Sequence, residues 1–165
     1  MIRVAISAVL FFVAFFIETS FISSLPSIFS TIPIVFGLSV YLIQNQNIYD
    51  GIGWMIGYGF LIDLMNMNDI PFYTISTAIA TLIAVTTARH LFSNRSFYGV
   101  MACSLSSYAA LVIVESFMTS FEWPIFLQMH FERLVMLMII VGILFYTAPK
   151  IFVFLKTSTN VSQRF

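Results

Sequence analysis

Long apolar segments follow one another along most of this chain, and the polar stretches between them are short. A helix needs roughly 20 predominantly apolar residues to cross the hydrocarbon layer of a bilayer. The sequence therefore predicts an all-α polytopic membrane protein, a single bundle of about six transmembrane helices that forms one domain over residues 1–165. The expected helices, of which the second is short, lie at about residues 4–22, 30–43, 49–65, 72–92, 97–118 and 132–151.

The composition agrees with this prediction and excludes several classes of protein. Charged residues make up 8% of the chain, apolar residues make up 60%, and the mean hydropathy is +0.99. A soluble domain is nearer a quarter charged, so most of this surface is expected to face lipid. Six helices use about 120 residues, which leaves no room for a soluble domain. A net charge of zero also excludes the basic surface typical of a nucleic-acid-binding protein.

Aromatic residues and prolines predict where the last helix begins and ends. Residues 121–129 include Trp123 and Pro124, and we expect this stretch to lie at the membrane interface rather than to span the bilayer. The last helix then begins near residue 132. Pro149 is expected to bend or end its last turn, because proline cannot continue the helical hydrogen bonding.

The basic residues predict the orientation of the bundle, because cytoplasmic loops of membrane proteins are enriched in Lys and Arg. With six spans and a cytoplasmic amino terminus, only Arg133 falls outside, and both termini lie in the cytoplasm. The opposite orientation would place six of the seven basic residues outside. Those six residues are Arg3, Arg89, Arg95, Lys150, Lys156 and Arg164.

Three acidic residues lie inside predicted spans, each near the outer end of an odd-numbered helix. Glu18, Asp63 and Glu115 should therefore share one depth in the membrane, close to the start of the last helix. We expect a polar cluster or partner contact there, with Arg133 or His130 as counter-ion; the alternative is that the acids extend toward the headgroups. Because a carboxylate near the end of its own helix meets the negative end of the helix dipole, we do not expect these acids to act as caps.

Small residues indicate where helices approach closely. Gly53 and Gly57 form a GxxxG pair, and Gly59 lies four residues before Asp63, so all three glycines are expected to serve internal helix packing. Cys103 is expected to be a small packing residue. Hydroxyl groups on the fourth and fifth helices are expected to bond carbonyls of the preceding turn. These are Thr74, Thr77, Thr81, Ser104, Ser106 and Ser107.

Sequence patterns of catalysis are missing. The chain has no histidine–glutamate zinc pattern, no Gly-x-Ser-x-Gly turn and no glycine-rich phosphate loop. Its two histidines, His90 and His130, are expected on opposite sides of the membrane, so they predict no metal site. We therefore expect no catalytic residue, no metal and no cofactor, and an intramembrane enzyme is the least favoured class.

The third helix and its exit resemble a known family. The stretch Gly57-Tyr-Gly-Phe-Leu-Ile-Asp63-Leu-Met, followed by a short polar turn and a long apolar helix that closes on Ala88-Arg-His-Leu-Phe92, resembles the rod shape-determining protein MreD family. The likeness is strongest over about residues 49–95. The turn at residues 65–71 departs from the family, because it lacks the expected glycine.

This resemblance implies a non-enzymatic scaffold in the bacterial cytoplasmic (inner) membrane. The scaffold would bind a bitopic MreC-like protein within the elongation machinery, which comprises a peptidoglycan glycosyltransferase, a transpeptidase and MreB, and would help set cell shape. The resemblance also implies that Asp63 is important for folding or for partner contact. An alternative is a small substrate-binding membrane component of an energy-coupling-factor-type transporter. An outward pocket ringed by Glu18, Asp63 and Glu115 would suit a cationic ligand in such a protein.

Overall fold

The computed structural model describes residues 2–26, 32–45, 47–67, 70–91, 96–118 and 123–161, and almost all of them are helical. No strand occurs among these residues, which confirms the all-α prediction. The α-helices are α1 (Ile2–Phe16), α2 (Ile34–Asn45), α3 (Ile48–Asn66), α4 (Phe72–Thr86), α5 (Phe97–Met118) and α6 (Trp123–Val161). Helix α1 continues into a π-helical turn, η1 (Ile17–Phe21), and a 3-10 turn, η2 (Ile22–Ser24), while α4 continues into a second π-helical turn, η4 (Thr87–Leu91).

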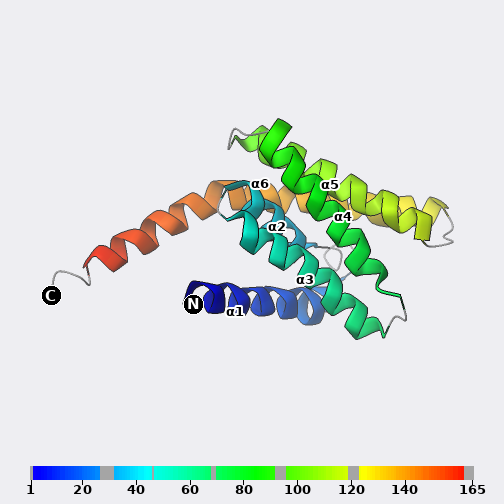
Figure 1. The fold of residues 1–165 in the computed structure, drawn as a ribbon, viewed down its shortest axis with the longest axis horizontal. Helices are drawn as coiled ribbons and strands as arrows, with labels where there is room; N and C mark the ends of the chain where they lie inside the picture. The colour runs from blue at the N-terminus through cyan, green and yellow to red at the C-terminus, as the bar shows by residue number, and fades with distance from the viewer. Residues whose placement is uncertain are drawn as a thin grey trace.

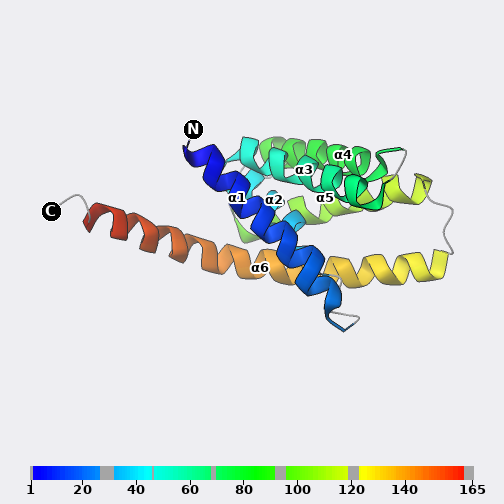
Figure 2. The ribbon, with the colours of Figure 1, turned by 90° about the horizontal axis from the view of Figure 1, so that it is seen from below.

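Successive helices run in alternating directions along the long axis of the molecule (Figure 1). Helix α3 packs against α2 and α4, and α5 packs against α4 and α6. The start of α1 and the end of α6 lie toward the same end, at the left of Figure 1, and Figure 2 shows α6 extending past the other helices there. We call the opposite end, where α1, α3 and α5 finish and α2, α4 and α6 begin, the hairpin end.

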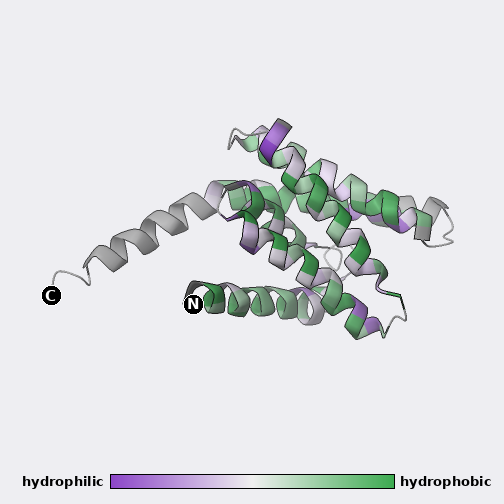
Figure 3. Cartoon of the chain, viewed as in Figure 1, coloured by the Kyte–Doolittle hydropathy of each residue, from purple (hydrophilic) through white to green (hydrophobic). Residues whose placement is uncertain are grey.

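Within the part of the chain that the structure describes, three helical stretches are long and apolar enough to cross a membrane: Val4–Ser24, Phe97–Phe117 and Gln128–Thr147. The apolar side chains cover outward-facing surfaces of the helices as well as the core (Figure 3). Phe12 and Phe16 of α1, for example, are 48% and 62% exposed. An apolar exterior of this kind suits lipid rather than water, so the chain is a membrane protein. The short apolar helix Ile34–Gln44 corresponds to the second expected segment.

Helix α6 differs from its prediction at both ends. It begins at Trp123 rather than near residue 132, and it ends at Val161 rather than near residue 151. The expected interfacial stretch is therefore the beginning of the helix, where Pro124 costs no internal hydrogen bond because first-turn amides have no helical partner. As a result, Arg133 lies inside the helix and within the apolar stretch Gln128–Thr147, and not at the start of the helix as expected.

Two close helix contacts depend on glycine. A Cβ atom on Gly51 would lie 2.7 Å from the Ser39 carbonyl oxygen of α2, and one on Gly59 would lie 2.6 Å from the Tyr73 carbonyl oxygen of α4. Both obstacles are backbone atoms, so α3 can approach its neighbours this closely only without a side chain. The expected packing role of Gly53 is wrong, because a Cβ atom there would meet nothing within 4 Å. Gly57 instead faces the ring of Phe11 in α1, at 3.3 Å.

The hydroxyl groups of α4 and α5 mostly satisfy their own helices, as predicted. Thr77 Oγ1 donates to the Tyr73 carbonyl at 2.8 Å, and Ser107 Oγ donates to the Cys103 carbonyl at 2.8 Å. Cys103 is fully buried and lies 3.3 Å from the Ala84 carbonyl of α4, which confirms it as a packing residue. Of these groups, only the Cys103 thiol reaches from α5 to the backbone of α4.

Candidate binding site

Glu18 connects three helices at the hairpin end. It lies in η1, and its carboxylate accepts a hydrogen bond from the Val35 amide of α2 at 2.7 Å and one from the Tyr58 hydroxyl of α3 at 2.7 Å. The π-helical turn carries one residue more per turn than an α-helix, so it changes the direction in which Glu18 leaves α1; such turns are frequent at functional sites. Val35 lies in the first turn of α2, whose amide groups have no helical acceptor. Glu18 therefore holds the start of α2.

Asp63 does the same for α4. Its carboxylate accepts from the Tyr73 amide at 3.1 Å, from the Thr74 amide at 2.7 Å and from the Thr74 hydroxyl at 2.6 Å. The residue before α4 is Pro71, whose side chain has no acceptor for the first-turn amides. Asp63 is only 6% exposed and supplies that acceptor from the neighbouring helix.

Glu115 faces the first half of α6. Its Oε2 lies 3.6 Å from Nε2 of His130, and its side chain is 16% exposed. The other ring nitrogen of His130, Nδ1, lies 3.1 Å from the Tyr108 hydroxyl of α5. His130 is buried and also packs against the ring of Phe126, with 4.2 Å between ring centroids. This group fixes α5 to α6, as the other two acids fix α1 to α2 and α3 to α4.

The expectation that these acids do not cap helices is therefore wrong for Glu18 and Asp63. Each lies toward the negative end of its own helix, as the sequence indicates, but its partner is the amide end of the next helix. In an antiparallel pair of helices the two ends are adjacent, and the positive end of the second helix dipole attracts the carboxylate.

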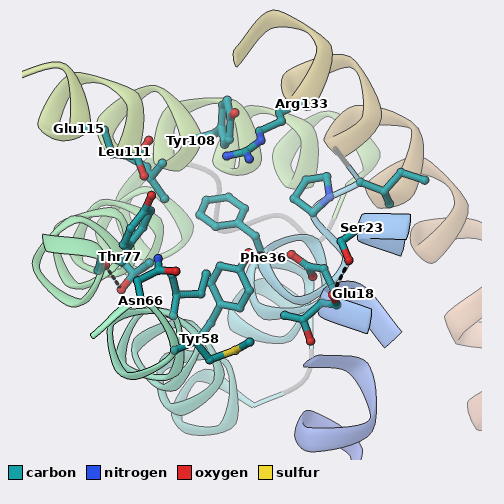
Figure 4. A pocket seen from close by; sticks show the side chains of 16 residues that line it. Glu18, Ser23, Phe36, Tyr58, Asn66, Thr77, Tyr108, Leu111, Glu115 and Arg133 are labelled. Carbon is teal, nitrogen blue, oxygen red and sulfur yellow. Dashed lines mark hydrogen bonds between the residues drawn. The ribbon is translucent and has the colours of Figure 1, made fainter. Parts of the chain in front are cut away.

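A cavity of about 350 Å³ opens among these groups, and residues from η1, η2 and the five helices α2 to α6 line it. Figure 4 shows Glu18, Glu115 and Arg133 reaching toward it from different elements. Arg133 lines the same cavity as both carboxylates, so it supplies a positive charge beside two negative ones. Four aromatic rings complete much of the wall, namely those of Phe36, Tyr58, Tyr73 and Tyr108.

Of the four residues expected to form a polar cluster, the cavity brings together Glu18, Glu115 and Arg133. Asp63 is not among the residues that line it, since its carboxylate is turned toward the start of α4. Sequence reasoning missed the tyrosines. Tyr58 lies five residues before Asp63 and Tyr108 seven before Glu115, so their shared position near the acids was the available signal.

The described residues include no group of three or more His, Cys, Asp or Glu side chains that could hold a metal ion. No protein-family model, curated protein or solved structure matches this chain. A cavity with two carboxylates, one guanidinium and four aromatic rings can hold a small molecule by charge and by ring contact.

Proposed function

We propose that this chain is a non-enzymatic scaffold of the bacterial cell-elongation machinery, with six spans of the cytoplasmic membrane and both ends in the cytoplasm. It binds an MreC-like bitopic protein and thereby helps to position peptidoglycan synthesis. The observation that carries the proposal is the role of the stretch that resembles the MreD family. Gly59 of that stretch allows the close approach of α3 to α4, and Asp63 accepts hydrogen bonds from the start of α4.

The direction of the helices supports the topology in this proposal. Six helices of alternating direction bring the start of α1 and the end of α6 to one end of the molecule (Figure 1). Arg3 of α1 and Arg89 of η4 lie toward that end, as do Lys150 and Lys156 of α6. Basic residues favour the cytoplasmic side, so the hairpin end faces outward. Only Arg133 of these described basic residues lies nearer the hairpin end.

The resemblance implies that Asp63 serves either folding or partner contact, and its burial favours folding. Its side chain is 6% exposed, and both oxygens are used within the hairpin of α3 and α4. We therefore assign Asp63 to folding, and we place the contact with a partner on outward-facing helix surfaces.

Co-purification tests the scaffold. The tagged full chain is expressed at native level in its own host and extracted in mild detergent, and its partners are identified by mass spectrometry. The proposal expects an MreC-like protein in stoichiometric amount. The Glu132→Gln variant should retain this partner. The Asp63→Ala variant should lose it, because the hairpin of α3 and α4 no longer holds. A chain that purifies folded and without any MreC-like protein would refute the scaffold.

A second candidate is favoured by the cavity itself. A volume of about 350 Å³ falls within the range of small-molecule sites, which is about 300–1,000 Å³. This favours a small substrate-binding component of an energy-coupling-factor-type transporter. A small molecule that remains bound after the same extraction, in place of a protein partner, would support this candidate and not the scaffold.

A further inference from the structure

The cavity at the hairpin end is too large to be a packing defect. Protein interiors are close-packed and contain few voids larger than a water molecule. A volume of about 350 Å³ corresponds to roughly a dozen water molecules at about 30 Å³ each. The fold keeps this space open between η1, η2 and helices α2 to α6, and its wall carries charged, polar and aromatic side chains beside a few aliphatic ones. Such a wall indicates a ligand.

The charges of the wall indicate the sign of that ligand. Counted as ionised, Glu18 and Glu115 contribute −2 and Arg133 contributes +1, which leaves −1 among the described lining residues. An unbalanced charge within a membrane protein is costly, and such residues normally pair with an opposite charge. A ligand with one positive charge balances the cavity, whereas an anion would meet two carboxylates.

The arrangement of Glu18 and the aromatic rings suits an ammonium group in particular. Val35 and Tyr58 each occupy one oxygen of the Glu18 carboxylate and so hold it in place, but each carboxylate oxygen can accept a second hydrogen bond. Tyrosine and phenylalanine faces attract ammonium cations. The rings of Tyr58 and Tyr108 line the same cavity as the two carboxylates, so a cation there meets both kinds of partner.

We propose that this cavity binds a small organic cation with a single ammonium group, whose charge lies between Glu18 and Glu115 and whose apolar body lies against the tyrosine rings. Arg133 balances one carboxylate and so limits the site to one positive charge. The proposal deepens the second candidate function but does not require it, because a scaffold can also hold a ligand.

Three compounds of similar size and different charge test the sign of the ligand. The full chain is placed in lipid nanodiscs, and phenethylammonium, phenylalanine and phenylacetate are titrated in by calorimetry, with choline and cyclohexylammonium as further cations. We expect saturable binding of at least one single-ammonium compound and none of phenylacetate. Tighter binding of phenylalanine or phenylacetate, or no binding of any cation to folded protein, would overturn the proposal.

Variants test the assigned residues. Glu18→Gln and Glu115→Gln should each weaken cation binding by at least about tenfold, as expected when one partner of a desolvated charge pair is removed. Glu132→Gln, on α6 but outside the cavity wall, should bind as the wild type does. Arg133→Gln should bind the cation at least as tightly, since it removes a like charge; a loss of binding in folded Arg133→Gln protein would contradict the assignment. Protection of the buried Cys103 thiol shows that each variant is folded. These binding results are independent of co-purification, so either proposal can fail alone.

Discussion

Asp63→Ala should separate the start of α4 from the end of α3. The substitution removes the acceptor of two backbone amides and one hydroxyl at a site that is 6% exposed. Loss of an N-cap costs about 0.5–2 kcal/mol, and leaving buried partners of a charged group unpaired raises the cost to about 3–5 kcal/mol. We therefore expect a loss of about 3–5 kcal/mol in the free energy of unfolding. Asp63→Asn keeps one acceptor oxygen and should lose about 1–3 kcal/mol.

The single cysteine of the chain supplies the assay. Cys103 is fully buried between α4 and α5, so its reaction with a maleimide in mixed micelles of increasing SDS content reports unfolding. Asp50→Asn is the matched control, because Asp50 also belongs to α3 but accepts its hydrogen bond locally, from Asn47 Nδ2 at 2.7 Å. If Asp63→Ala unfolds at the same SDS content as this control, the carboxylate does not hold the hairpin and the reasoning is wrong.

Five further substitutions test three other features in the same assay. Gly59→Ala should destabilise the fold by about 2 kcal/mol or more, since its Cβ atom would meet the backbone of α4. Gly53→Ala should stabilise the fold by up to about 1 kcal/mol, because alanine has the higher helix propensity and the position is open. Equal effects of the two substitutions would contradict the packing of α3 against α4. Met67→Gly should stabilise by about 0.5–1 kcal/mol, because Met67 ends α3 with a φ of 49°, and a loss of stability would count against that conformation. Tyr58→Phe should lower the free energy of unfolding by about 1 kcal/mol, because the hydrogen bond to the Glu18 carboxylate is lost. Tyr98→Phe, whose side chain is 81% exposed, should have no measurable effect. Equal stability of the two variants would show that the Tyr58 hydrogen bond does not stabilise the fold.

The position of the acidic residues at the hairpin end could be predicted from the alternating direction of the helices. Because odd helices run in one direction, Glu18, Asp63 and Glu115 had to lie toward one end, and hydropathy placed five of the six helices close to their observed bounds. The sequence lacks the glycine that is expected in the turn after Asp63. In the structure Met67 of that turn takes the left-handed conformation that favours glycine.

Other features depend on contacts between helices that a single sequence does not contain. The choice of Gly51 rather than Gly53 as a contact depends on which face of α3 meets α2. The capping of α4 by Asp63 depends on the helix after it and not on its own helix. Helix α6 begins at Trp123, earlier than expected. An aromatic stretch with a proline near its start can therefore form the first turns of a helix as well as an interfacial segment.

Cysteine accessibility in spheroplasts tests the central claim most directly, namely that the hairpin end and its cavity face outward. In a Cys103→Ala background, a cysteine is placed at Ser23, which lines the cavity, or at Asn47, which lies between α2 and α3 at the other end. A membrane-impermeant maleimide should label Ser23→Cys in intact spheroplasts and label Asn47→Cys only after lysis. Labelling of Asn47→Cys from outside, with Ser23→Cys protected until lysis, would contradict the account.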